Sequence, residues 1–305
     1  MSTELATILD LIRYGGSRFN AAGLCFGHSY DNGLDEATQL VLHALHLPHD
    51  LNPVYGQARV TAEERETVLA LFERRVRERI PAAYLTGEAW FAGLSFKCDR
   101  RALVPRSPIA ELIETGFQPW LGEVEVERAL DLCTGSGCIG IAMAHHHPDW
   151  QVDCVDLSPE ALSLAQENVE RLQVQDRVRL LQGDLFAPVA GEVYQLIVSN
   201  PPYVTHDEVA ALPPEYRHEP ELGLRAGEDG LDLALRILRD AADHLAPGGL
   251  LVVEVGESER ALVRRLPELP FAWIEFKVGP MGVFALRRED LVEHAAAIAA
   301  AAAGR

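Results

Sequence analysis

The residues best suited to chemistry stand together near the middle of the chain, as Asn200-Pro201-Pro202-Tyr203. They follow an apolar, β-rich run, residues 194–199, that is typical of a buried strand. Because a proline has no N–H to donate and restricts the residue before it, the two prolines end this strand in a stiff corner. The corner carries a carboxamide and a phenol.

This corner has the groups needed to hold a planar –NH2 group. The Asn200 carboxamide oxygen and the Pro201 carbonyl can each accept one hydrogen, while the Tyr203 ring lies against the flat face. Holding both hydrogens draws the nitrogen toward tetrahedral geometry and frees its lone pair to attack an electrophile. Taken alone, the motif favours a strand-terminating turn, so the residues around it decide.

A second set of residues is suited to binding. Asp131 lies near the end of a predicted strand, residues 129–132, which leads into a glycine loop made of Cys133, Thr134, Gly135, Ser136 and Gly137. The loop is neither a G-x-G-x-x-G dinucleotide fingerprint nor a phosphate-binding G-x-x-x-x-G-K-[ST] loop. A cofactor that has no pyrophosphate, and that the glycine backbone approaches closely, fits it better.

Two further acidic residues end the next two predicted strands. Asp156 is placed to accept the hydroxyls of a ribose, and Asp184, flanked by Leu185, is placed to accept from an adenine amine. Each acid alone is typical of a helix or turn cap. Their repetition at successive strand ends predicts an adenosine-type cofactor site, because open sheets bind ligands at that edge.

No metal site is predicted. The histidines of His145-His146-His147 cannot face one ion from a helix, and they suit a helix C-terminus instead. The five cysteines include no Cys-x-x-Cys pair and no disulfide framework, which favours a reducing compartment.

The first 80 residues or so predict helices. Apolar residues recur at helical spacing over 5–12 and 35–47, and Thr61 with Glu64 is a capping box that opens a third helix ending at Glu78. Four arginines (Arg74, Arg75, Arg77, Arg79) form a basic face on that helix. We interpret this face as solvent-exposed, with partner binding as the less favoured alternative.

The rest of the chain predicts a hairpin and then a sheet. Short β-like pieces cover 84–87, 89–93 and 94–97, and a helix follows at 109–114. Strands and helices then alternate, with strands at 129–132, 152–155, 178–181, 196–199, 250–255, 271–277 and 282–286. Alternation indicates a parallel sheet, and the short turn between the last two strands makes them antiparallel. After residue 289 we expect an alanine-rich, frayed helix.

Composition bounds the function. The net charge of -19, from 27 basic and 46 acidic side chains, argues against binding of nucleic-acid backbone and suits a basic protein partner. The N-terminus lacks a signal pattern, and no apolar run approaches the ~20 residues of a membrane span. We expect a cytoplasmic protein with no membrane association.

As a set, these motifs resemble a known family. Asp131 to Gly137, Asp156, Asp184 and the corner look like the class I S-adenosylmethionine-dependent methyltransferases that modify planar amide or amine nitrogens. With the helical N-terminal part and Val104-Pro105-Arg106, the chain resembles the protein glutamine N5-methyltransferases. The run 105–113 and the run 216–224 are similar to the branch that acts on the third protein of the large ribosomal subunit. Cys133 departs from the general family, where glycine is common at that position.

The resemblance implies a fold and a domain organisation. The fold class is α/β: a Rossmann-like, seven-stranded sheet with an antiparallel last strand, a smaller helical N-terminal domain and a hairpin connector. The expected division is 1–117 for substrate recognition, 118–127 as linker, 128–290 as methyltransferase domain and 291–305 as alanine-rich tail.

The resemblance also implies an activity and a site. We expect transfer of a methyl group from S-adenosylmethionine to a glutamine side-chain amide in a basic ribosomal protein, with no direct recognition of nucleic acid. The alternatives are glutamine methylation of release factors, adenine methylation of nucleic acid, and a non-catalytic assembly factor that binds the cofactor. The expected catalytic residues are Asn200, Pro201, Pro202 and Tyr203; the expected cofactor-binding residues are Asp131, Cys133, Thr134, Gly135, Ser136, Gly137, Asp156, Leu157, Asp184, Leu185 and Asn200.

Overall fold

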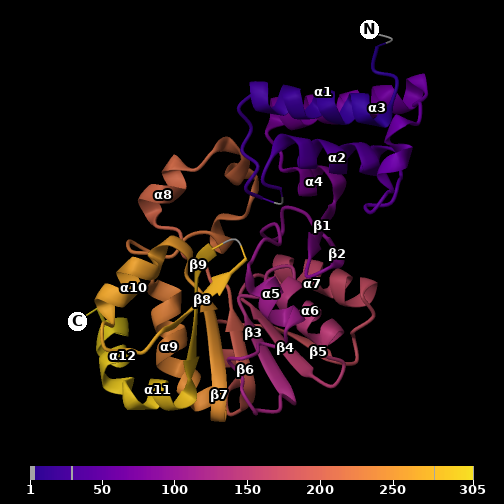
Figure 1. Cartoon of the computed structure of the whole chain (residues 1–305). Helices are drawn as coiled ribbons and strands as arrows, with labels where there is room; N and C mark the ends of the chain where they lie inside the picture. The colour runs from indigo at the N-terminus through magenta and orange to yellow at the C-terminus, as the bar shows by residue number, and fades with distance from the viewer. Residues whose placement is uncertain (1–3, 29, 278, 305) are drawn as a thin grey trace.

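The computed structural model describes residues 4–28, 30–277 and 279–304. A group of N-terminal helices sits against a larger unit built on one twisted sheet (Figure 1). A long segment after the sheet's central strand, residues 200–230, extends toward these helices. No helix in the described ranges is long and apolar enough to cross a membrane.

The N-terminal helices form where the sequence predicts them. They are α1 (Ile8–Ala21), α2 (Gly33–Ala44) and α3 (Ala62–Glu78), followed by the short α4 (Ala82–Thr86). Thr61 and Glu64 form the predicted capping box of α3. The rings of Phe19 and Phe72 meet edge to face at 5.1 Å in the core of this unit. Gly15 permits that contact, because a Cβ there would lie 2.6 Å from the Phe72 ring.

The basic face predicted on α3 is wrong for two of its arginines. Arg75 is fully buried, and its guanidinium pairs with Glu36 of α2. Arg79 donates to the backbone carbonyls of Ala22 and Gly23. Arg74 and Arg77 do face solvent. The sequence shows that these arginines lie close together on one helix. Only the tertiary contacts decide which of them meet acidic side chains or backbone carbonyls and which face solvent.

The connector differs from the prediction in one segment. Residues 84–86, predicted as β-like, belong to α4 because the backbone N–H groups of Tyr84 and Leu85 both donate to the carbonyl of Pro81, and Gly87 is the C-cap of this helix. A run this short has too few residues for its periodicity to separate helix from strand. The hairpin itself is confirmed as β1 (Glu88–Phe91) and β2 (Leu94–Lys97), and α5 (Ile109–Glu114) has the predicted bounds.

Seven strands form the large sheet in the order β5-β4-β3-β6-β7-β9-β8. Their bounds are β3 (Arg128–Leu132), β4 (Gln151–Asp156), β5 (Val178–Gln182), β6 (Tyr194–Ser199), β7 (Leu245–Glu254), β8 (Ala272–Phe276) and β9 (Gly279–Arg287). The first five are parallel, and β9 runs antiparallel between β7 and β8. The predicted mixed sheet with an antiparallel last strand is confirmed.

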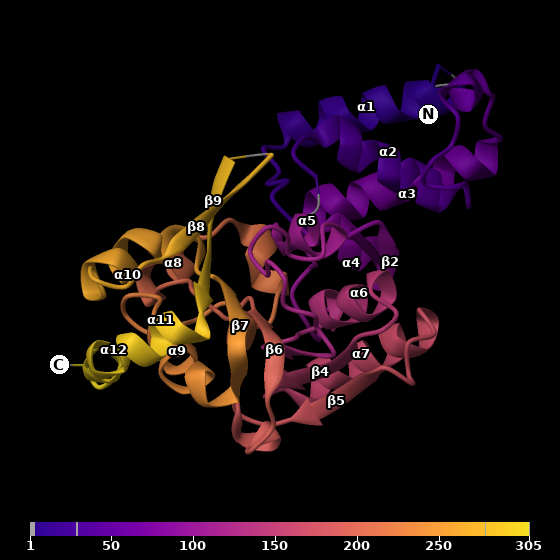
Figure 2. The ribbon, with the colours of Figure 1, turned by 60° about the horizontal axis from the view of Figure 1, so that its bottom comes forward.

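Helices cover both faces of this sheet (Figures 1 and 2). On one face α5 packs with α6 (Cys138–His146) and α7 (Pro159–Arg171). On the other are α9 (Asp232–His244), α10 (Glu259–Arg265), α11 (Arg288–Glu293) and α12 (Ala295–Ala302). Each face of the sheet has its own hydrophobic core. Strand β3 contributes to both, because Ala129 packs in the core beneath α5 and α6, and Leu130 and Leu132 pack in the core beneath α9.

Three local predictions need correction. Strand β7 begins at Leu245 instead of residue 250, because Leu245 already pairs with Tyr194 before a register shift. Helix α10 was not predicted. The alanine-rich tail is not frayed: Ile298 is 1% exposed, and α12 packs on α9.

The division of the chain into domains remains our proposal. Phe91 and Phe96 of the hairpin and Ile109 of α5 are buried in the same core as residues of the sheet and α6. The helices before residue 83 have a separate core. This packing favours assigning the hairpin and α5 to the sheet unit.

Candidate active site

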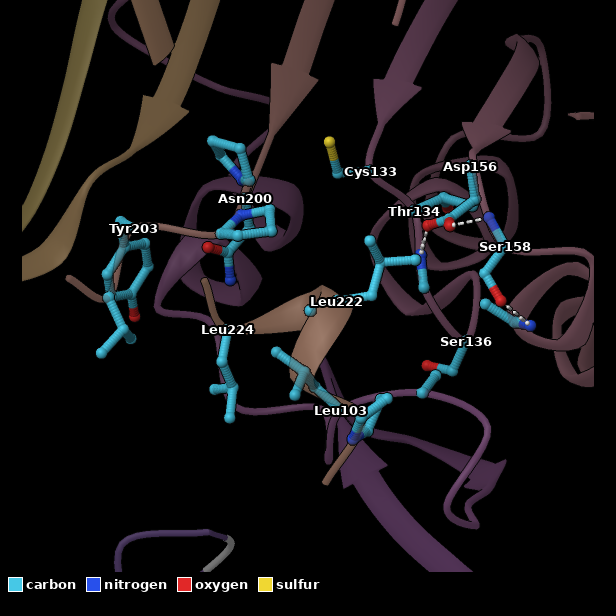
Figure 3. A pocket seen from close by; sticks show the side chains of 18 of the residues that line it. Leu103, Cys133, Thr134, Ser136, Asp156, Ser158, Asn200, Tyr203, Leu222 and Leu224 are labelled. Atoms are coloured by element: carbon cyan, nitrogen blue, oxygen red, sulfur yellow. Dashed lines mark hydrogen bonds between the residues drawn. The ribbon is translucent and has the colours of Figure 1, made fainter. Parts of the chain in front are cut away.

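A cavity lies at the carboxyl ends of β3, β4, β5 and β6, where the segment 200–230 and the stretch before α5 close it from the other side. Its volume is about 620 Å³. The predicted residues in its wall are Cys133, Thr134, Gly135, Ser136, Asp156, Leu157, Asp184, Leu185, Asn200, Pro201, Pro202 and Tyr203. The sheet thus brings the glycine loop, both acids and the corner into one cavity. Figure 3 shows Asp156, the loop residues Cys133, Thr134 and Ser136, and the corner around this cavity.

Asp131 and Gly137 do not line the cavity. The buried Asp131 carboxylate accepts from the Thr134 hydroxyl and from Gly140 N–H at 2.9 Å, so it holds the loop to the first turn of α6. Burial raises the pKa of Asp131 to about 7, although these two hydrogen bonds oppose the shift. Gly137 has a φ of 80°, and a Cβ there would lie 2.7 Å from Ile141. Both residues therefore shape the loop from behind.

The loop's wall residues are held in turn by the neighbouring helix and strand. The Asp156 carboxylate accepts from Gly135 N–H at 2.8 Å and from Ser158 N–H at 2.9 Å. Desolvation raises its pKa, and these backbone bonds oppose the shift. Asn168 of α7, fully buried, donates to the carbonyl of Ser136 at 3.0 Å. We did not predict a role for Asn168, because its position inside a helix carries no local signal.

Cys133 has a φ of 59°, in the left-handed region that favours glycine. This conformation gives a physical reason for the glycine that is common at this position in the resembling family. The thiol lines the cavity, and burial raises its pKa.

Asp184 lies in the cavity wall but is half-exposed. Its carboxylate accepts from Arg236 of α9 at 2.6 Å. Any ligand amine would share this carboxylate with Arg236. Leu185 beside it is buried, with a φ of 48°.

The corner after β6 is built as the sequence predicts. Ser199 is fully buried and donates to the Leu132 carbonyl at 2.8 Å, which ties the end of β6 to β3. Asn200 follows, with its carboxamide pointing into the cavity (Figure 3). In this view the carboxamide lies between the Tyr203 ring on one side and Cys133 and Asp156 on the other.

Tyr203 is held by residues that the sequence did not single out. Its hydroxyl donates to Glu254 Oε1 at 3.1 Å, and Ser107 Oγ donates to Glu254 Oε2 at 2.6 Å. Glu254 ends β7 and is 5% exposed. A glutamate at the end of an apolar strand is visible in the sequence, but its two partners are 51 and 147 residues away.

The opposite wall comes from the segment 200–230 and from residues before α5. Leu103, Leu222 and Leu224 line it, and Leu222 is 56% exposed (Figure 3). Arg106 donates to the buried Glu219 carboxylate at 2.5 and 2.9 Å, which joins these two parts of the wall. This side of the cavity is mainly apolar, and sequence reasoning identified its runs only by resemblance.

Within the described ranges, no group of three His, Cys, Asp or Glu side chains is arranged to hold a metal ion. His146 and His147 bond the backbone carbonyls of Ala92 and Ile113.

Comparisons with known proteins give the same picture. A family model for the methyltransferase small domain matches residues 117–212. The Xanthomonas campestris pv. campestris protein named ribosomal protein uL3 glutamine methyltransferase is 69% identical over 99% of this chain and 98% of its own length. The Neisseria gonorrhoeae protein of the same name is 51% identical over 95% of this chain and 97% of its own.

Among solved structures, the hMettl16 catalytic domain in complex with MAT2A 3′UTR hairpin 1 has a TM-score of 0.51. It is 18% identical, and the match covers 83% of this chain and 88% of that one. At this identity the likeness concerns the fold alone.

Proposed function

Because the chain belongs to the ribosomal protein uL3 glutamine methyltransferases, we propose that it transfers a methyl group to the side-chain amide nitrogen of a glutamine in ribosomal protein uL3. The predicted family, fold class and enzyme class are confirmed. One observation carries the proposal to the site: the glycine loop, Asp156 and the Asn200 corner line a single cavity.

The proposed cofactor is S-adenosylmethionine, and the residues in the wall fit it. Each Asp156 oxygen accepts one backbone N–H and keeps lone pairs, so the carboxylate has room for both hydroxyls of a ribose. Gly135 has a φ of 57°, and the nearest atom to a Cβ there would be 3.8 Å away, so its backbone is open to a ligand. When bound, the cofactor supplies an electrophilic methyl group, and the protein supplies binding and orientation.

The residues of the corner orient the glutamine. Asn200 Oδ1 and the Pro201 carbonyl each accept one hydrogen of the substrate amide, and Tyr203 packs beside it. Two acceptors fix the plane of the amide, and fixed orientation of reacting groups removes much of the entropic barrier. The apolar wall at Leu103, Leu222 and Leu224 suits the aliphatic stem of a glutamine side chain.

The acidic composition supports a basic protein substrate over a nucleic acid. The net charge of -19 repels a phosphate backbone, whereas a ribosomal protein rich in Lys and Arg is attracted. We propose that the N-terminal helices and the segment 200–230 recognise the folded substrate, because the segment lines the cavity and Arg75 of α3 contacts its Glu215.

The test compares three methyl acceptors at matched concentrations: purified uL3, a peptide-release factor and duplex DNA. Labelled S-adenosylmethionine and mass mapping should place the label on a uL3 glutamine. Asn200→Ala should lower the rate about 10²- to 10³-fold while cofactor binding is retained, since it removes one orienting acceptor.

Cofactor binding by calorimetry is the control, because it reports a folded site independently of turnover. Preferential labelling of the release factor or of DNA would overturn the substrate assignment. A near wild-type rate in the Asn200 variant would show that the corner is only structural.

A further inference from the structure

We propose that the segment Glu254–Ser258 is a positioning element for Tyr203, in which the Glu254 carboxylate fixes the phenol hydroxyl and thereby the ring beside Asn200. This inference rests on the proposed function and adds residues to its machinery that the corner motif does not contain. It is carried by the contacts of three residues in the segment with three different parts of Tyr203.

The first contact is the carboxylate. Ser199 of β6 pairs with Val253 of β7, so Asn200, which follows β6, and Glu254, the last residue of β7, emerge at the same edge of the sheet. The Tyr203 hydroxyl donates to Glu254 Oε1 at 3.1 Å. A hydrogen bond to an ionised acceptor is stronger than a neutral one, so this contact holds the ring firmly.

The second and third contacts involve the ring and the backbone of Tyr203. Gly256 has a φ of 50°, and a Cβ there would lie 2.6 Å from the Tyr203 ring, so only glycine lets the ring rest against this segment. Ser258 Oγ donates to the Tyr203 carbonyl at 3.1 Å. The hydroxyl, the ring and the carbonyl of Tyr203 are thus all held by one short stretch that begins at the last residue of β7.

Ser107 fixes the carboxylate itself. Its hydroxyl donates to Glu254 Oε2 at 2.6 Å while accepting from Ile109 N–H at 3.2 Å, so Ser107 links the start of α5 to the end of β7. Ser107 also lines the cavity. The aromatic group beside the reacting amide is therefore connected to the stretch that closes the cavity.

The surroundings of Glu254 predict a pH dependence of kcat, which a role in packing alone would not produce. Burial raises the pKa of Glu254 to about 7, opposed by the bonds from Ser107 and Tyr203 and by the charge of Arg106. Its partner on β9 is Val283, which does not titrate. Ionised Glu254 accepts a stronger hydrogen bond from the Tyr203 hydroxyl than the protonated form does. Because this bond holds the ring beside Asn200, kcat should rise as the pH increases through about 7.

The experiment measures kcat and KM for uL3 across pH 5.5 to 9 in wild type, Glu254→Gln, Tyr203→Phe and the double variant. Each single change should lower kcat about ten- to hundredfold, with KM within threefold and cofactor affinity unchanged. Glu254→Gln should also lose the rising limb near pH 7. Because Glu254 acts through the Tyr203 hydroxyl, the double variant should be no slower than the slower single variant.

Glu275→Gln is the matched control, since Glu275 is an exposed carboxylate on β8 of the same sheet, and it should keep the wild-type profile. Multiplicative losses in the double variant, or an unchanged pH limb in Glu254→Gln, would overturn the inference. If Glu254→Gln does not fold, Tyr203→Phe tests the inference by itself. A wild-type kcat in that variant, which lacks the hydroxyl, would refute the positioning role of Glu254. Failure of the wild type to methylate uL3 refutes the proposed function instead.

Discussion

At the residue scale, three carboxyl groups at or near strand ends have different tasks, and two of them, Asp131 and Glu254, are buried. Asp131 bonds the loop from behind, Asp156 combines loop support with an open face toward the cavity, and Glu254 bonds the hydroxyl of Tyr203. Desolvation raises the pKa of all three. The hydrogen-bond partners of each acid, and not its position in the sheet, therefore determine whether it supports the structure or faces a ligand.

Asp156→Ala should weaken S-adenosylmethionine binding about ten- to hundredfold, because hydrogen bonds to a charged acceptor contribute ~1.5–3 kcal/mol. Loss of the bond to Gly135 N–H loosens the loop and acts in the same direction. Calorimetry measures the affinity, with the exposed Asp176→Ala as control. Unchanged affinity in a folded Asp156 variant would remove this residue from the cofactor site.

Asp131→Asn should make the protein's stability less dependent on pH. In the folded state the pKa of Asp131 is about 7, whereas its ordinary value is 3.8. Between these two pH values the folded state therefore holds a proton on Asp131 that the unfolded state has lost. Stability from this group is then complete below about pH 4 and is lost as pH rises through 7, at up to ~1.4 kcal/mol per pH unit.

Denaturant unfolding at pH 5.5, 6.5, 7.5 and 8.5 measures this. The wild type should lose more free energy of unfolding over the series than Asp131→Asn, which keeps both acceptor contacts but does not ionise. Parallel curves for the two proteins would contradict the assignment of Asp131 as a source of this pH dependence.

At the scale of elements, helix α3 and the segment 200–230 depend on each other. Arg75 Nε donates to Glu36 Oε1 at 2.8 Å, and its Nη1 lies 3.5 Å from Glu215 Oε1 in the short helix η3 (Pro214–His218). Burial raises the pKa of Glu36, whereas bonds from Cys25 N–H and Arg79 outweigh burial and hold that of Glu215 below its usual value. This buried network attaches the cavity's outer wall to the N-terminal helices.

Arg75→Met should destabilise the protein by about 3–5 kcal/mol, because it leaves two buried carboxylates without their shared cation. Arg77→Met, on the same helix, is the matched control: its side chain is 76% exposed, and it should change stability by less than about 0.5 kcal/mol. Denaturant midpoints measure both. Equal stability of the two variants would mean that the network does not hold the segment 200–230.

At the scale of the whole molecule, the acidic excess governs how a basic substrate approaches. Opposite charge accelerates encounter at low salt, and position-specific contacts then choose the glutamine. The acidic side chains provide the long-range attraction of the substrate. The apolar wall of the cavity contributes little to that attraction and acts only on the side chain that enters.

High salt should therefore weaken capture of uL3 without a matching change in turnover. The Debye length falls from about 10 Å at 0.1 M to 3 Å at 1 M, so kcat/KM should fall by ~10-fold or more between low and high salt. Steady-state rates at both ionic strengths measure this, with kcat at saturating uL3 as internal control. A salt-independent kcat/KM would exclude electrostatic capture.

The sequence alone determined the features that depend on neighbouring residues. The capping box at Thr61, the strand ended by Pro201 and Pro202, and the alternation of strands and helices each follow from local hydrogen bonding or periodicity. Because the carboxyl ends of parallel strands share one edge of a sheet, these features also placed the glycine loop, Asp156 and Asn200 at that edge.

Only the tertiary structure decided which polar groups face the cavity and which hold it together. Asp131 turns toward Thr134 and Gly140, Arg75 meets Glu36, and Ser107 meets Glu254 across 147 residues of sequence. None of these choices has a periodic or motif signal. A buried polar group must find a partner wherever the packing of distant elements supplies one, and local sequence does not contain that packing.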